Sequence, residues 1–348
     1  WVSPEPAQSA KEESMTDDTR INELEQEIFA TELDSFVPDK ILDSHSHMWT
    51  QTTNEDGIPP GFKEFDADVT MDIWRSRLDD LLPGRQQSAL FLPLSIRGSI
   101  ADAELQNEWV SREAHTDPLS RPAMWISPNM DPDYVRQEVK RLRPSGFKCY
   151  HTESPRVPTF ESEIPEFLPE EHVRVAHDEG LTITLHMVKE RSVSVASNQH
   201  WIKYYCEKYS NMKLILAHAA RSFNPAFADQ GIESLQGLQN LYCDTSAVAE
   251  SGAFEAIIRV LGHNRLLWGS DWAVSHARGK YVSVGYSWVW IELDNVPPPR
   301  YSTQSPFVFN GLESLRALKQ AATHTQLSDS QIEDIFFGNL AGVLGVED

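Results

Sequence analysis

The sequence predicts an α/β protein built on a (β/α)8 TIM barrel, with an N-terminal extension and an insertion after the eighth strand. Three observations support this fold. Eight short apolar runs alternate along the chain with amphipathic stretches of helical spacing. The runs are almost continuously apolar, which is typical of parallel strands that are buried on both faces. The chain has 348 residues, 40% of them hydrophobic, which is enough for one barrel with a large core.

The first 38 residues form a separate region. Residues 1–20 are rich in Pro, Ser and Glu and show no apolar periodicity, so we expect them to be disordered. From Ile21 onward the spacing of Ile21, Leu24 and Ile28 predicts a short helix that packs on the main body. The barrel itself is predicted to span residues 39–348.

The alternating pattern assigns eight strands and eight helices. The predicted strands are residues 40–43, 89–94, 123–127, 146–150, 181–186, 213–218, 241–245 and 265–269. The predicted helices are residues 71–82, 102–115, 132–142, 169–179, 199–209, 232–239, 254–261 and 311–322. A doubly wound open sheet is the alternative. It fits less well because it gives no reason for eight units and because no glycine-rich phosphate loop follows the first strand.

Two connections are longer than a barrel requires, residues 48–68 and residues 272–310. Both follow strands, so they should lie at the C-terminal face, where barrel enzymes carry their active sites. The second is rich in large aromatic residues, among them Tyr281, Tyr286, Trp288 and Trp290. It is predicted to form either a small surface subdomain with its own core or an aromatic lid over the substrate.

The charge of the chain limits its partners. It has 30 Lys and Arg against 52 Asp and Glu, a net charge of −22, which argues against binding to nucleic acid or to an anionic membrane surface. Residues 1–39 contain eleven acidic and only two basic residues, so the barrel is less acidic than the total suggests. We expect a small-molecule partner, which could still be carboxylated, and the sequence leaves a homodimer open.

The cysteines indicate a reducing compartment. Cys149, Cys206 and Cys243 are odd in number and widely spaced, as expected for reduced core thiols and not for disulfides or a thiolate zinc site. We find neither the pattern of a secretory leader nor an apolar run near the roughly 18 residues of a membrane span. The sequence therefore predicts a cytoplasmic protein.

A His-x-His pair follows the first predicted strand, at His45 and His47. Residues i and i+2 of a strand point to the same face, so both imidazoles can bind one ion. Neutral imidazole suits Zn²⁺ as well as Mn, Fe and Ni ions. The pair alone would be weak evidence for a metal site.

Three further polar residues stand at strand ends. His186 ends the fifth predicted strand, His218 ends the sixth, and Asp271 follows the eighth. A single histidine in such a place is more often a hydrogen-bonded rim residue. Because the carboxyl ends of barrel strands converge around the axis, four histidines and one aspartate together predict a metal centre.

These motifs resemble those of the amidohydrolase superfamily, in particular the amidohydrolase-related branch that includes aminocarboxymuconate-semialdehyde decarboxylase and related hydrolases. The matching segments are Asp-Ser-His-Ser-His at 43–47, Thr-Leu-His ending at His186, Leu-Ala-His ending at His218, Leu-Leu-Trp-Gly-Ser-Asp-Trp ending at Trp272, and the Asn-Leu-Ala stretch at 339–341. The resemblance extends over residues 40–346 and implies a TIM barrel of the metal-dependent hydrolase type. It does not indicate the substrate.

The resemblance also implies a role for each site residue. His45, His47 and His186 would bind one divalent ion, expected to be Zn²⁺ with Mn²⁺ as the alternative. Asp271 would bind the same ion and accept a proton from the water it activates, because such an ion lowers the pKa of water from about 15.7 to about 7. His218 would lie just outside the ligands and polarise a carbonyl or protonate a leaving group.

Other candidates concern substrate binding. Lys148 ends the fourth strand, where binuclear members of the superfamily carry a carboxylated lysine between two ions. We expect one ion per chain instead, with Lys148 binding substrate or forming an ion pair. Arg97 and Arg221 follow the second and sixth strands and could bind a carboxylate, while Trp49 and His276 could line the pocket.

The sequence leaves three functions open. The first is a metal-dependent hydrolase acting on an ester, lactone or amide. The second is a lyase that uses the same metal site to decarboxylate or hydrate an unsaturated or aromatic carboxylic acid, and two cations beside the metal would favour it. The third is a barrel without catalysis, which the intact set of five metal and acid–base positions argues against.

Overall fold

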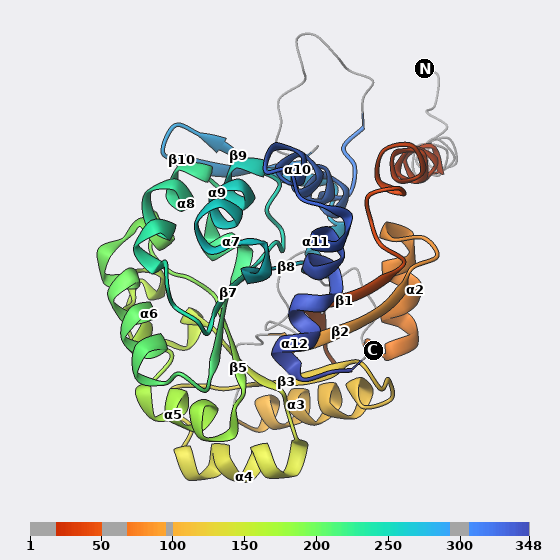
Figure 1. Ribbon diagram of the computed structural model, residues 1–348. Helices are drawn as coiled ribbons and strands as arrows, with labels where there is room; N and C mark the ends of the chain where they lie inside the picture. Colours follow the sequence, from red (N-terminus) through yellow and green to blue (C-terminus); the bar gives the residue numbers. More distant parts are fainter. Residues whose placement is uncertain (1–18, 51–67, 95–99, 293–305, 348) are drawn as a thin grey trace, which may run out of the picture.

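The computed structural model describes residues 19–50, 68–94, 100–292 and 306–347 (Figure 1). Eight strands form one parallel sheet in sequential order, and helices surround it. The strands are β1 Lys40–Met48, β2 Gln86–Pro93, β3 Arg121–Trp125, β4 Gly146–Cys149, β5 Thr182–Leu185, β6 Lys213–Leu216, β7 Leu241–Asp244 and β8 Leu266–Leu267. The predicted (β/α)8 barrel is thereby confirmed.

The barrel closes between β1 and the segment that follows β8. The Ser44 amide donates to the Trp268 carbonyl at 2.9 Å, and the His47 amide donates to the Trp272 carbonyl at 3.0 Å. A parallel bridge also joins Ser46 to Trp272. β1 is longer than predicted because its pairing with β2 continues to Met48, so the His-x-His pair lies within the strand and not after it.

The helices largely follow the predicted order. They are α2 Met71–Leu81, α3 Ile100–Ala114, α4 Pro132–Leu142, α5 Glu170–Glu179, α6 Ala196–Lys208, α7 Ala217–Arg221, α8 Pro225–Gly231, α9 Ser251–Leu261, α10 Asn310–His324, α11 Asp329–Glu333 and α12 Asn339–Leu344. The prediction of a helix at residues 232–239 was wrong. Asn224 caps α8 by accepting from the Ala226 amide, and Pro225 fits its first turn, so the helix begins earlier and only a 3-10 turn follows at Ile232–Leu235.

Apolar side chains fill the space between the strands and the outer helices, as the continuous apolar runs imply. A second apolar cluster lies inside the barrel, where Leu42, Leu90 and Leu267 pack against Leu340 and Val343 of α12. This layer supports the strands from within. The polar side chains described below occupy the carboxyl ends of the same strands.

Both additions to the barrel contain secondary structure. The predicted N-terminal helix is present at residues 19–33 and ends in a π-helical turn, Phe29–Leu33. In the insertion, β9 Gly279–Val284 and β10 Ser287–Glu292 form an antiparallel hairpin. Residues 51–67 and 293–305 of the two long connections lie outside the described residues. Within the part that is described, no helix is both long and apolar enough to cross a membrane.

Candidate functional site

The His-x-His pair is buried at the carboxyl end of β1. Pairing with β2 shifts by one residue between Asp43 and Ser46, so β1 carries a bulge where the pair begins. The ring centroids of His45 and His47 lie 5.2 Å apart. Both residues are buried: 1% of the surface of His45 and 5% of that of His47 is exposed. Bulges re-aim side chains near active sites, and this one directs both imidazoles to the same space.

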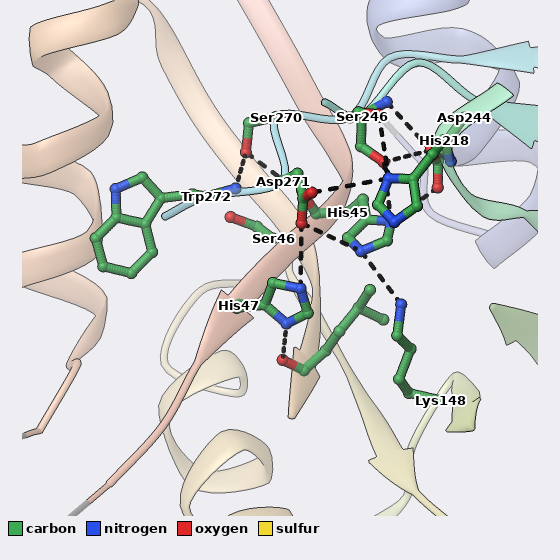
Figure 2. A network of polar contacts seen from close by, with 12 residues as sticks. His45, Ser46, His47, Lys148, His218, Asp244, Ser246, Ser270, Asp271 and Trp272 are labelled. Carbon is green, nitrogen blue, oxygen red and sulfur yellow. Dashed lines mark hydrogen bonds and ion pairs between the residues drawn. The ribbon is translucent and has the colours of Figure 1, made fainter. Parts of the chain in front are cut away.

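Asp271 places a carboxylate between three imidazoles (Figure 2). Its Oδ1 lies 3.3 Å from His47 Nε2 and 3.5 Å from His45 Nε2, and its Oδ2 lies 3.7 Å from His218 Nδ1. The residue has a positive φ of 56° and its amide donates to the His45 carbonyl at 2.7 Å. This left-handed conformation, uncommon for a residue other than glycine, turns the carboxylate toward the barrel axis.

The hydrogen bonds of His47 show that this space suits a cation. Its Nδ1 must donate to the Leu92 carbonyl at 3.1 Å, because a carbonyl can only accept. Burial lowers the pKa of His47, so the ring is neutral and its Nε2 carries a lone pair. That lone pair faces the Asp271 carboxylate, and two acceptors at 3.3 Å repel each other unless a cation lies between them.

His45 repeats this arrangement. Its Nδ1 donates to Asp244 Oδ2 at 2.9 Å, which leaves the Nε2 lone pair directed into the site. Burial lowers the pKa of His45 as well. Nε2 accepts from Lys148 Nζ at 3.2 Å and lies near Asp271. His45, His47 and Asp271 have ligand atoms within 4.8 Å of one another, as a bound divalent ion requires.

Asp244 is a site residue that the sequence reasoning missed. Besides binding His45, its Oδ1 accepts from the His218 amide at 2.8 Å and from Ser246 Oγ at 2.5 Å. Burial alone would raise the pKa of Asp244, but the neighbouring His45 outweighs it and the pKa is lowered. The signal was present in the sequence, since Asp244 ends the seventh strand as Asp271 follows the eighth.

Substitution of Asp244 by asparagine should lower the affinity for Zn²⁺ about 10- to 100-fold, the usual effect of losing a carboxylate that orients a ligating histidine. Asparagine has only one acceptor oxygen, so either His45 Nδ1 or the amides of His218 and Ser246 would lose their acceptor. Competition with a chromophoric zinc chelator at pH 7 measures the affinity. Asp117→Asn is the control, because Asp117 pairs with Arg75 before β3. Equal affinities in the two variants would contradict the orienting role.

Asp43 fixes the closure of the barrel beneath the site. Its Oδ1 accepts from the His45 and Ser270 amides, both at 2.9 Å, and its Oδ2 accepts from Ser270 Oγ at 2.5 Å. Burial raises the pKa of Asp43 to about 7. One side chain thus connects the residues before His45 with those before Asp271, and it keeps the two ligands in register.

His186 and Lys148 extend the site toward the fourth and fifth strands. The His186 ring lies 5.0 Å from that of His218, and its Nδ1 is buried without a hydrogen-bond partner. A buried nitrogen left in this state is expected of a ligand that lacks its ion. Burial lowers the pKa of Lys148 to about 8, opposed by the charges of Asp271 and Asp244.

His218 and Arg221 lie on one left-handed turn. The four residues from His218 to Arg221 have φ of 58°, 51°, 56° and 57°, so the short α7 turns in the sense that L-residues avoid. As a result both side chains are buried, with 5% and 7% exposed. His218 Nδ1 is 2.8 Å from Ser246 Oγ, and burial lowers the pKa of His218 to about 4.

Arg221 is buried without a carboxylate partner among the described residues. Its guanidinium lies 4.3 Å from the Phe160 ring centroid and 5.0 Å from that of Trp288. Its only described hydrogen bond is a long one, 3.5 Å to the Lys189 carbonyl. Burial lowers the pKa of Arg221 to about 10, so the group still carries its charge at neutral pH.

The remaining candidates differ in position. Trp49 stacks on Trp272 at 5.3 Å between centroids, which places it beside the residue after Asp271. His276 is directed elsewhere: its Nε2 contacts the Arg77 carbonyl at 2.7 Å and its ring lies 4.8 Å from Phe309. The structure therefore does not bring His276 to the histidine cluster. Arg97 lies outside the described residues.

The sequence matches the model of one known protein family. The family model of amidohydrolases matches residues 43–339. No curated protein matches the sequence.

Solved structures share the fold at low sequence identity. A zinc-bound amidohydrolase from Burkholderia multivorans is 16% identical, with 88% of this chain and 99% of that chain covered and a TM-score of 0.56. A protein from Pseudomonas putida named provisionally as a 2-pyrone-4,6-dicarboxylic acid hydrolase is 13% identical, with 90% and 100% covered and a TM-score of 0.56. The 2,6-dihydroxybenzoate decarboxylase from Rhizobium is 13% identical, with 90% of this chain and 100% of that chain covered and a TM-score of 0.56.

Proposed function

This chain belongs to the amidohydrolase family, and on that premise we propose that it is a metal-dependent hydrolase acting on an ester, lactone or amide bond of a small molecule. One observation carries the proposal. A buried carboxylate, Asp271, lies within 3.3 to 3.7 Å of nitrogens of His45, His47 and His218 at the carboxyl ends of the strands. An acid–base group beside a cation site is what hydrolysis of such bonds requires.

The residues present fit one divalent ion. His45 Nε2, His47 Nε2 and Asp271, whose ligand atoms lie within 4.8 Å of one another, would bind it. His186 lies outside that group, and we propose it as a further ligand because its Nδ1 is buried without a hydrogen-bond partner. We propose Zn²⁺, with Mn²⁺ as the alternative, because three imidazoles and one carboxylate suit both. We propose a single ion, with Lys148 as an unmodified lysine beside Asp271 and Asp244. The ion would supply Lewis acidity and a more acidic water.

The chain's own side chains would move the proton. Burial alone would raise the pKa of Asp271, but the surrounding imidazoles outweigh it and lower the pKa below its usual range, so this carboxylate is ionised at neutral pH. Its oxygens Oδ1 and Oδ2 therefore carry no proton and are the proposed acceptors. His218 is neutral at pH 7, and its Nδ1 must donate to the Ser246 carbonyl at 3.1 Å, so its Nε2 can take up a proton and deliver it to the leaving group. Asp244 and Ser246 orient His218 and His45.

The substrate is proposed to carry a carboxylate. Arg221 is the group to bind it, since its buried guanidinium lacks an anionic partner among the described residues and lies between the rings of Phe160 and Trp288. Lys148 supplies a second buried cation at the centre of the site. Trp49 is proposed to line the pocket on the side of Trp272. Arg97, which follows β2, is also proposed to contact the substrate.

A decarboxylase or hydratase acting on an unsaturated or aromatic acid is the second candidate. The two buried cations, Arg221 and Lys148, favour it, because a lyase of this kind must recognise a carboxylate. It would use the same metal and acid–base residues.

The three cysteines are free and buried, which supports a cytoplasmic location.

A substrate panel tests the choice. The purified protein, reconstituted with Zn²⁺ or Mn²⁺, is incubated with lactones, esters, amides and carboxylated aromatics, and products are identified by mass spectrometry. Ring opening or bond hydrolysis supports the hydrolase, whereas loss of CO2 or addition of water to a double bond supports the lyase. No product from any compound in the presence of bound metal would favour a barrel without catalysis.

Substitution of Arg221 by methionine should raise KM for a carboxylated substrate about 10- to 100-fold, since a hydrogen bond to a charged group contributes about 1.5–3 kcal/mol. The methyl ester of the same substrate should change less than about threefold, because it offers no charge to bind. Arg191→Met is the control, since Arg191 is exposed and lies over Tyr286. An equal rise in KM for acid and ester would show that Arg221 does not bind the carboxylate.

A further inference from the structure

The insertion after β8 leaves and rejoins the barrel through a narrow neck. An antiparallel bridge joins Arg278 to Phe309. On either side of it the Gly279 amide donates to the Val308 carbonyl at 3.2 Å and the Asn310 amide donates to the Ala277 carbonyl at 2.9 Å. The hairpin β9–β10 begins directly beyond this neck, so its position depends on how the two neck segments are held.

Glu25 of the N-terminal helix binds both segments of the neck. Its Oε1 accepts from Arg278 Nε at 3.0 Å and from the Phe309 amide at 2.9 Å, and its Oε2 accepts from Arg278 Nη2 at 2.9 Å. Only 3% of Glu25 is exposed. Arg278 is further bound by Asn22 Oδ1 at 2.5 Å. A buried carboxylate from a segment far away in sequence thus joins the two ends of the insertion.

The hairpin in turn forms part of the wall of the site. Tyr281 of β9 and Trp288 of β10 lie 4.1 and 4.9 Å from the Phe223 ring, between centroids. Phe223 stacks on His218 at 5.7 Å, and Trp288 is one of the two rings against Arg221. A shift of the hairpin would therefore move the aromatic surface on which Arg221 rests.

The hairpin is too closely packed at its base to absorb a displacement of the neck. A Cβ at Gly279 would lie 2.4 Å from the Ile291 carbonyl oxygen and 2.8 Å from Trp290 Cζ2. Trp290 contacts Tyr281 at 5.0 Å. Movement at Arg278 is thus transmitted through rigid neighbours to Tyr281, three residues further along the chain.

We propose that Glu25 is a positioning residue: the N-terminal helix fixes the neck of the insertion through Glu25 and thereby holds the Tyr281–Trp288 wall against Arg221. The step to catalysis rests on the proposed function, in which Arg221 binds the substrate carboxylate. The step from Glu25 to the hairpin does not, and it is tested without substrate.

The first experiment is amide hydrogen exchange of the full chain, comparing wild type with Glu25→Ala and Glu25→Gln. Glu25→Ala should speed exchange of the β9–β10 amides at least about tenfold while strands β1–β7 stay protected. Glu25→Gln should give a smaller increase, because its amide oxygen can still accept from Phe309. Glu32→Gln is the matched control, since Glu32 is on the same helical segment but pairs with Arg316 of α10.

Unchanged exchange in the hairpin of Glu25→Ala would overturn the proposal, whether or not the protein is a hydrolase. An equal increase in Glu32→Gln would also overturn it, because the effect would then come from loosening the whole helix. Should Glu25→Ala fail to fold, Arg278→Met removes the same ion pair from its partly buried partner and must give the same hairpin-specific increase.

The second experiment uses whichever substrate the panel identifies. Glu25→Ala should raise KM about fivefold or more with kcat within twofold of wild type, because the wall beside Arg221 is displaced while the reacting groups keep their places. A lower kcat at unchanged KM would overturn the positioning role. Absence of any substrate would count against the proposed function alone, since the exchange result stands independently.

Discussion

Replacement of Asp271 by asparagine should lower kcat about 10³-fold, within the range expected for loss of a general base. Asparagine has the same shape but cannot accept the proton, and it withdraws the negative charge that lies 3.3 Å from His47 Nε2. The measurement is the initial rate with the substrate that the panel identifies, together with circular dichroism to verify the fold. Residual activity above about one tenth of wild type would contradict the base role. Asp117→Asn, at a partly buried aspartate paired with Arg75, should keep full activity.

Replacement of His47 by alanine should abolish stable metal binding. The change removes a bond to the metal itself, so affinity should fall well beyond the roughly 10- to 100-fold expected from losing an orienting residue. Metal content after reconstitution with Zn²⁺ and gel filtration, measured by plasma mass spectrometry, should drop from about one equivalent to less than about a tenth. His200→Ala, on the exposed face of α6, is the control. A wild-type protein that takes up no transition metal would overturn the metal centre itself.

Much of the site could be predicted from the polar residues at the ends of the predicted strands, because a barrel brings all these ends together. Apolar runs mark parallel strands, and polar residues at their carboxyl ends must meet around one axis. That rule found His45, His47 and Asp271, which the structure brings within one ligand sphere. The same rule would have found Asp244, the last residue of β7, had it been applied to every strand.

Other features could not be read from the local sequence. The stretch from Ala217 to Arg221 has an ordinary composition, and the adjacent residues Ala219 and Ala220 give no sequence signal for a positive φ. The conformation follows from tertiary contacts, such as the bond from Asp244 to the His218 amide, which override local preference. Distance along the chain was equally misleading for His276, which follows the eighth strand but turns toward α2.

The N-terminal extension shows a further limit. Its helix was predicted from apolar spacing to pack on the main body, with no partner predicted for its acidic residues. Glu25 is instead among the buried charged residues, because Arg278 and the Phe309 amide, more than 250 positions away, supply its partners. A contact between residues so far apart in the sequence produces no pattern in either segment from which it could be predicted.

The left-handed turn from His218 to Arg221 has a consequence for directed evolution. Glycine adopts positive φ without the steric penalty that alanine pays, so glycine at Ala219 or Ala220 would ease this backbone. A library ranked by thermal tolerance alone would therefore enrich glycine at these two positions. The same substitutions would loosen the short link that sets the spacing between an acid–base group and an anion-binding group. In this protein the most accessible gains in heat resistance lie where selection for turnover should reject them.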